Sequence, residues 1–170
     1  DLTVLAAACD ELLACGDRET AAEAEISLTE ASWLRGDRDR SMGYLERARE
    51  LAEGLEPSRA NAYVASSVSR FLMLFGEDAE ALRVGREALA MAEQLGLGEL
   101  RAHALNYVGV ARVHIGDPGG IDDLERSMAV AAQTSSLGEL CRSMFNLGTV
   151  LWGQGQLSRA MALVEQMTEL

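Results

Sequence analysis

A repeated pattern with a period of about 40 residues, within the range of known helical repeats, constrains this chain more than any other feature. Residues 97–100 read LGEL, and the same four letters return at residues 137–140. Residues 145–149, FNLGT, repeat the pattern of residues 106–110, NYVGV. Glycines that break the chain stand at nearly equal intervals, as Gly36, Gly76, Gly116 and Gly155. Such a period indicates a stack of similar supersecondary units.

Each unit has the pattern of two helices joined by a tight turn. In residues 102–131, Leu105 and Val108 lie at helical spacing. The segment 116–120, GDPGG, then breaks the chain, and Leu124 begins a second apolar stripe. Apolar residues at this spacing, interrupted by glycine and proline, predict a helical hairpin.

A glycine stands inside two of the predicted first helices, at Gly109 and Gly148. Glycine in a helix interior costs about 1 kcal/mol relative to alanine. A close approach of a neighbouring helix, which a Cβ atom would obstruct, explains this choice. We therefore expect both glycines at the closest helix–helix contacts.

The composition favours helix and excludes several classes of function. Hydrophobic residues make up 48% of the chain, which contains only two prolines. The 27 acidic residues against 15 basic ones, all arginine, argue against binding to a phosphate backbone. No apolar run approaches the roughly 20 residues that a membrane span requires. The cysteines Cys9, Cys15 and Cys141 form no C-x-x-C pair, so we expect buried thiols in a reduced, cytoplasmic setting.

The pattern predicts one domain of nine helices over residues 1–170. We expect a half repeat over 1–16, followed by hairpin repeats over 18–55, 57–95, 98–135 and 138–170. The apolar stripes at both ends lack a polar cap, which indicates a fragment of a longer stack with sticky ends that self-associate.

These motifs resemble the tetratricopeptide repeat over nearly the whole chain. The leucine-glycine pair of that family reads Val108-Gly109 and Leu147-Gly148, and degenerates to Leu28-Thr29 and Val68-Ser69. The Gly-Asp turn reads Gly36-Asp37 and Gly116-Asp117, and weakens to Gly76-Glu77 and Gly155-Gln156. The resemblance implies an all-α, right-handed superhelical solenoid of antiparallel helical hairpins.

The period exceeds the roughly 34 residues of the standard repeat. It resembles the longer repeats of maltose-regulator-like bacterial signalling ATPases, transcription activators and cyclases. This resemblance implies a binding or sensing module of a larger cytoplasmic bacterial regulator, whose ATPase and output domains lie outside these residues.

No constellation of residues predicts catalysis, a metal site or a cofactor. His103 and His114 are separated by about 16 Å along one helix, so they cannot share a metal ion. The segment 116–120 lacks the Lys-Ser/Thr and the preceding strand of a phosphate loop. Acid pairs such as Asp122-Asp123 are interpreted as solvated surface. The chain is not expected to be an enzyme.

In tetratricopeptide-like stacks the first helix of each hairpin lines a concave groove. Aligning each repeat on its turn glycine places aromatic, arginine, asparagine and histidine side chains there, the types that recognition surfaces use. These residues are Trp33, Tyr63, Arg70, His103, Asn106, Tyr107, His114, Arg142, Phe145, Asn146 and Trp152. An alternative for the aromatic residues is packing against the next first helix.

The groove residues suggest a peptide, a partner protein, a neighbouring domain of the parent chain or a small effector as ligand. Arg70 and Arg142 would form a local positive spot suited to a carboxylate or phosphate. The alternative function is a structural spacer between an ATPase and an output domain. Neither nucleic acid nor membrane is an expected partner.

Overall fold

The computed structural model describes residues 2–169, and within that range all regular structure is helical. The predicted all-α class and the nine predicted helices are therefore confirmed. The helices are α1 (Leu2–Ala14), α2 (Arg18–Leu34), α3 (Arg38–Ala52), α4 (Arg59–Phe75), α5 (Asp78–Gln94), α6 (Gly98–His114), α7 (Gly120–Gln133), α8 (Leu137–Gly153) and α9 (Leu157–Thr168). The sequence predicts that the second hairpin repeat begins at residue 57, but α4 begins at Arg59 after its cap Ser58, so Pro57 lies outside the first helical turn.

The Gly-Asp turns have a direct physical explanation. Gly36 adopts a φ of 74°, which only glycine reaches without strain, and this conformation closes α2. The amide of Asp37 then donates to the carbonyl of Ser32. The Asp37 side chain in turn accepts from the amide of Arg40 and caps α3. One dipeptide therefore ends one helix and begins the next.

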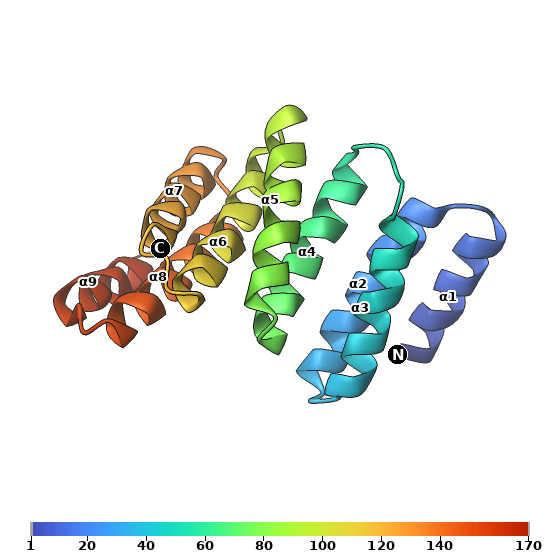
Figure 1. Ribbon diagram of the computed structural model, residues 1–170, viewed down its shortest axis with the longest axis horizontal. Coiled ribbons are helices and arrows are strands. Elements are labelled where there is room, and N and C mark those ends of the chain that lie inside the picture. Colours follow the sequence, from blue (N-terminus) through green and yellow to red (C-terminus); the bar gives the residue numbers. More distant parts are fainter. Residues whose placement is uncertain (1, 170) are drawn as a thin grey trace.

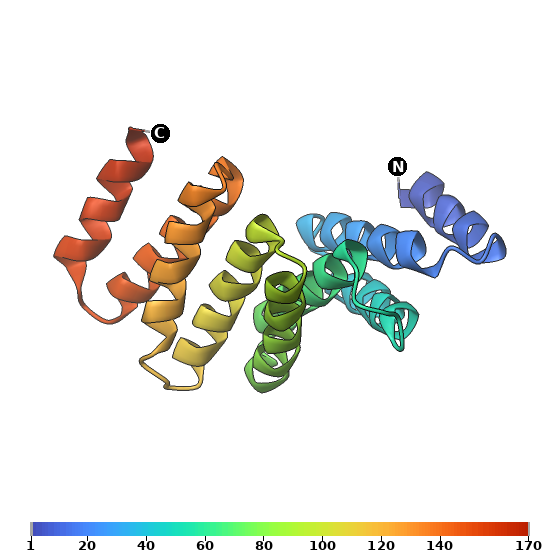
Figure 2. The same cartoon turned by 90° about the horizontal axis from the view of Figure 1, so that it is seen from above.

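The helices pair into hairpins that follow one another along the long axis of the molecule (Figure 1). The hairpins are α2/α3, α4/α5, α6/α7 and α8/α9, and α1 packs on α2. First helices pack against the next first helices, whereas the backbones of successive second helices lie farther apart. Long side chains join these second helices, in the ion pairs Arg49–Glu80 at 2.9 Å and Arg159–Glu125 at 2.6 Å. Because spacing is shorter on the side of the first helices, the stack bends, and both ends of the arc lie on the same side (Figure 2).

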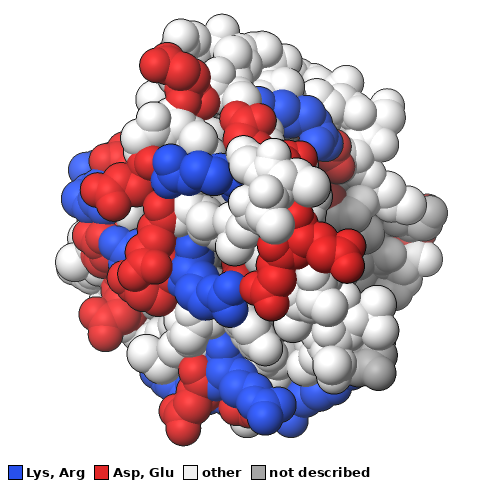
Figure 3. Space-filling view, turned by 90° about the vertical axis from the view of Figure 1, so that its right-hand side faces the viewer, with Lys and Arg blue, Asp and Glu red and all other residues white. Residues whose placement is uncertain are grey.

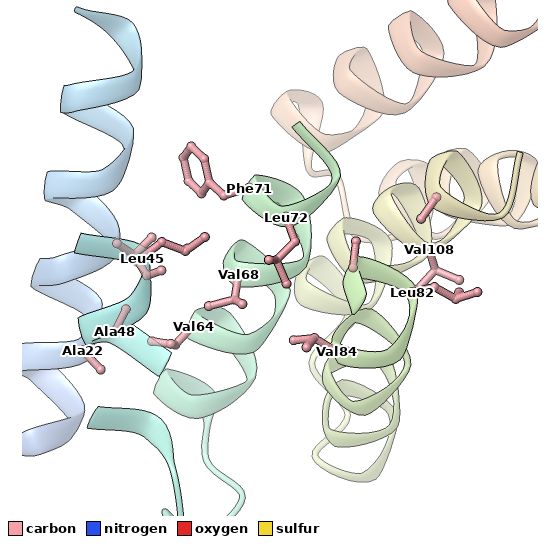
Figure 4. Packing of buried hydrophobic residues seen from close by; sticks show 13 residues of the cluster. Ala22, Leu45, Ala48, Val64, Val68, Phe71, Leu72, Leu82, Val84 and Val108 are labelled. Carbon is pink, nitrogen blue, oxygen red and sulfur yellow. The ribbon is translucent and has the colours of Figure 1, made fainter. Parts of the chain in front are cut away.

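The core runs between the layers of helices. Figure 4 shows its main cluster, in which Leu45 of α3, Phe71 of α4 and Val108 of α6 contribute buried side chains. Small residues sit where the two helices of a hairpin cross. Ser69 donates to the carbonyl of Ala81 at 2.8 Å, and Ser41 donates to the carbonyl of Thr29 at 3.0 Å.

The two helix glycines differ. A Cβ atom at Gly109 would lie 2.7 Å from the carbonyl oxygen of Gly120 and 2.8 Å from Leu124, so the predicted close contact is present. A Cβ atom at Gly148 would meet nothing within 4 Å. The prediction for Gly148 is therefore wrong, because α9 crosses α8 without approaching this glycine.

Charged residues pair extensively. Asp123, expected on the solvated surface, is 6% exposed and binds Arg112 and Arg126, so that expectation is wrong. Arginine and acidic side chains are interspersed on the face at the α1 end (Figure 3). No helix in the described part of the chain is long and apolar enough to cross a membrane.

The three cysteines have different environments. Cys9 is buried, Cys141 is partly buried and Cys15 is exposed, so the expectation of buried thiols is fully met only by Cys9. The Cys9 thiol lies 3.2 Å from a carboxylate oxygen of the buried Glu25. Burial and this carboxylate raise the pKa of Cys9 to about 12.

Candidate functional site

The concave side of the stack contains a hollow where four successive first helices converge. Its volume is about 180 Å³, and we call it the groove hollow. The residues lining it come from α2, α4, α6 and α8: Ile26, Glu30, Arg59, Tyr63, Ser67, Arg70, Glu99, Leu100, His103, Glu139 and Arg142. The hollow is therefore polar, with apolar contacts from Ile26 and Leu100.

Three arginines and three glutamates line the groove hollow. Arg70 pairs with Glu30 at 3.0 Å. Arg142 lies 3.4 Å from a carboxylate oxygen of Glu139. The expectation of a local positive spot at the two arginines is therefore wrong, because each is balanced by a glutamate from the same groove.

His103 lies at the base of the hollow and is held neutral. Its Nδ1 lies 2.5 Å from the Ser66 hydroxyl, and its ring packs edge-on against Tyr107 at 4.9 Å between centroids. Burial lowers the pKa of His103 to about 3, and the charges of Arg142 and Arg70 act in the same direction. His103 therefore contributes a neutral imidazole at physiological pH.

Some polar atoms of the hollow lack a hydrogen bond, although Arg142 Nε is within ion-pair distance of Glu139 Oε1. Glu139 Oε2 and Arg142 Nε are buried and make no hydrogen bond. Burial raises the pKa of the Glu139 carboxyl, although the positive charge of Arg142 opposes this shift. Arg59 is exposed at the rim and has no ion-pair partner within residues 2–169. Buried polar groups without partners are uncommon in folded proteins and require an explanation.

Five predicted groove residues join the first helices to one another. Asn146 donates to the Asn106 side chain at 3.2 Å, and Arg142 donates to the Tyr107 hydroxyl at 3.3 Å. Trp33 packs edge-on against Phe75 with ring centroids 5.5 Å apart. For Trp33 and Tyr107, this is the packing role that the sequence left open as an alternative.

The remaining predicted residues lie away from the groove hollow. His114 pairs with Asp78 of α5 at 2.8 Å, at the turn end of its helix. Phe145 and Trp152 are exposed beside an apolar hollow between α8 and α9. Of the predicted set, the structure therefore brings Tyr63, Arg70, His103 and Arg142 together around the groove hollow.

The sequence reasoning missed Arg59, Glu99 and Glu139, although they carried a usable signal. These residues recur at the repeat period, near the start of α4, α6 and α8. Positions in phase with the repeat lie on the same face of the stack. A search for charged residues at this interval would have found them.

Comparison with known proteins supports the fold. No family model matches this sequence, and no curated protein sequence matches it significantly. Three solved structures with similar folds illustrate the likeness. They are aspartyl phosphate phosphatase F from Bacillus subtilis (19% identity, TM-score 0.71), BtubC (BKLC) from P. vanneervenii (20%, 0.69) and a kinesin light chain protein with nearly identical TPR-like repeats from Podosopora anserina (17%, 0.65).

The matches differ in how much of each protein they cover. The chain aligns over 95% of its own length with the phosphatase but spans 43% of that protein, and the corresponding values for BtubC are 90% and 64%. The alignment with the Podosopora protein covers 99% of this chain and 93% of that one. At this level of identity the likeness shows the fold, which is that of a tetratricopeptide-like helical repeat.

Among the described residues, no group of three or more histidine, cysteine, aspartate or glutamate side chains could hold a metal ion. The groove hollow instead offers hydrogen-bond donors, acceptors and both signs of charge within a volume of about 180 Å³. Such an arrangement can recognise a polar side chain, a chain terminus or a small polar molecule.

Proposed function

We propose that this chain is a non-catalytic recognition module that binds a peptide segment, a partner protein or a small effector in its concave groove. The observation that carries the proposal is the groove hollow, where the rim residue Arg59 lacks an ion-pair partner and Glu139 Oε2 lacks a hydrogen bond among the described residues. Unpartnered groups at a concave, partly apolar site favour a ligand with both donors and acceptors.

The module would belong to a larger cytoplasmic bacterial regulator. Support for this context comes from the long repeat period, which resembles that of maltose-regulator-like ATPases, transcription activators and cyclases. Each hairpin contacts only its neighbours, so small rotations between hairpins add up along the stack. Ligand binding across four first helices would therefore change the pitch of the superhelix.

One observation favours the alternative of a structural spacer. Several groove side chains bond to one another, in the pairs Arg70–Glu30 and Asn146–Asn106. A spacer requires only a stack of fixed length, so it would tolerate substitutions in the groove. A recognition module would not.

Arg59 provides the sharpest test. Charge reversal at Arg70 or Arg142 would also break an ion pair, whereas Arg59→Glu changes a residue without an ion-pair partner in the described part of the chain. A phage-displayed library of random peptides would be panned against the protein, and the enriched peptides measured by calorimetry. Loss of a charge-assisted hydrogen bond weakens binding by about 1.5–3 kcal/mol.

The matched control is Arg86→Glu, an exposed arginine on α5 outside the groove hollow. We expect weakened binding for Arg59→Glu and unchanged binding for Arg86→Glu. Equal affinities in both variants, or no enriched peptide, would contradict groove recognition and favour the spacer.

A further inference from the structure

An apolar face on α8 and α9 has no cover among the described residues. Its exposed members are Phe145 (64% exposed), Trp152 (62%), Met161 (50%) and Val164 (52%). With Gly148 and Met167 they line a hollow of about 290 Å³, and we call these six residues the end patch. Exposed apolar residues are ordinary when scattered, but a contiguous patch marks an interaction site.

The repeat shows what covers the same position elsewhere in the chain. Trp33 and Trp152 each stand three residues before the turn glycine of their hairpin. Trp33 is partly buried because Phe75 of α4, the next first helix, packs edge-on against its ring. No described helix does the same for Trp152.

The second helices give the same result. Three second helices can be compared at the position four residues after their first buried small residue. This position is occupied by Gly85 in α5, Leu124 in α7 and Val164 in α9. A Cβ atom at Gly85 would lie 2.8 Å from Val108 of the next first helix, α6. Leu124 is fully buried in a cluster that includes side chains of the next first helix, α8. Val164 occupies the equivalent position and remains half exposed. The first buried small residues are Ala81, Gly120 and Ala160.

We propose that the end patch is the docking site of an amphipathic helix, which lies on α8 and α9 as α4 lies on α2 and α3. The docked helix presents an apolar stripe to the patch and places an aromatic or branched side chain over Trp152, as Phe75 lies over Trp33. The argument is continuity, since the patch repeats an interface that the chain forms at each earlier hairpin.

Charge indicates which kind of helix would bind the end patch. The chain carries a formal net charge of −12, so a helix with a neutral or basic polar face is favoured. The helix α4 itself has two arginines, Arg59 and Arg70, and no acidic residue. A second copy of this chain is disfavoured, because it would carry the same net charge of −12.

The probe is a synthetic peptide with the sequence of residues 58–76, which contains α4 and its cap and has no tryptophan. It is titrated into the whole chain while tryptophan fluorescence and heat of binding are recorded. We expect saturable one-to-one binding and a blue shift in emission as Trp152 loses water. A scrambled peptide of the same composition should do neither. In Trp152→Phe the blue shift should disappear while calorimetric binding remains.

Two matched variants locate the site. Val164→Glu places a charge in the centre of the end patch and should weaken peptide binding at least about tenfold. Val4→Glu makes the same substitution at another exposed valine, 68% exposed on α1, and should leave affinity unchanged. Both positions are exposed, so circular dichroism should show unchanged helix content. Arg59→Glu should also leave affinity unchanged, which separates the end patch from the groove hollow.

Three results would overturn the proposal. The first is the absence of saturable binding. The second is equal affinity for Val164→Glu and Val4→Glu, or a loss of affinity in Arg59→Glu, which would place the peptide elsewhere. The third is concentration-dependent dimerisation in analytical ultracentrifugation that Val164→Glu abolishes, which would assign the patch to a second copy.

Discussion

The hairpins α6/α7 and α8/α9 have the same sequence pattern but pack to different depths. Gly109 faces Gly120 across its hairpin, and a Cβ atom at either residue would collide with the backbone of the other. Gly148 occupies the equivalent position in α8, but a Cβ atom there would meet open space. The second helix explains the difference, because α7 brings a glycine to the crossing whereas α9 brings Ala160. Close packing therefore depends on small residues in both helices.

The hairpins α6/α7 and α8/α9 also differ in whether a further first helix packs against them. Leu124 and Val164 occupy equivalent positions in α7 and α9, yet Leu124 is fully buried and Val164 is half exposed. The chemistry of the two side chains is similar, so the next first helix makes the difference. In a stack, burial is a property of a position between neighbours rather than of a residue type.

The largest expected effect contrasts Leu124→Ala with Val164→Ala. Leu124→Ala leaves a cavity in a packed cluster and should lower the free energy of unfolding by about 2–5 kcal/mol. Val164→Ala removes a half-exposed side chain and should change it by less than about 0.5 kcal/mol. Urea denaturation with an unchanged m value measures both. Similar losses in the two variants would show that the end patch is covered in solution.

The next effect concerns the close crossing of α6 and α7. Gly109→Ala would place a methyl group 2.7 Å from a backbone oxygen that cannot rotate away. We expect a loss of about 1–3 kcal/mol in the free energy of unfolding, and a larger loss for Gly109→Leu. Thermal and urea denaturation report this change. A loss below a few tenths of a kcal/mol would mean that the two helices are not in tight contact.

A third contrast uses pH. His103 of α6 contacts Ser66 of α4, whereas α8 and α9 contain no histidine. Its pKa falls to about 3 in the folded state, so the unfolded chain binds a proton at higher pH than the folded chain does. The free energy of unfolding should therefore decrease as pH falls from about 6.5 toward 3, by at most about 1.4 kcal/mol per pH unit.

The variant His103→Gln isolates this effect. Burial raises the pKa values of Glu25 and Glu139, so these groups bind protons more readily in the folded state. Their protonation therefore raises the free energy of unfolding as pH falls, which opposes the effect of His103. The difference in slope between the parent chain and His103→Gln removes their contribution. Identical slopes in both proteins would show that His103 titrates normally.

The fold could be predicted from the sequence because its determinants are local. The turn glycines, the caps such as Asp37 and the apolar stripes lie within single hairpins, so their spacing predicts nine helices. The depth of the crossing at Gly148 could not be predicted, since it depends on how Ala160 of another helix meets it. The partly buried ion pair of Arg112 and Asp123 likewise depends on the three-dimensional arrangement of the helices.

The candidate site could be predicted only in part. Repeat phase placed Tyr63, Arg70, His103 and Arg142 on one face, and these residues do line the groove hollow. The repeat spacing alone could not show which glutamate would reach Arg70 or Arg142. The sequence therefore suggested a local positive charge at these two arginines. It also could not separate the groove from the end of the stack, where Trp152 lies.

The smallest expected effect tests the open side of the glycine comparison. In Gly148→Ala the added methyl group meets no atom within 4 Å, so no collision opposes the gain in helix propensity. Removing a glycine from a helix interior should raise the free energy of unfolding by about 0.5–1 kcal/mol, opposite in sign to Gly109→Ala. Paired denaturation curves of the two variants measure this sign difference directly. If Gly148→Ala were destabilising as well, α8 and α9 would cross as closely as α6 and α7, and the end patch would be smaller than described. A stabilising Gly148→Ala would show that the glycine is not required by the packing of its own hairpin.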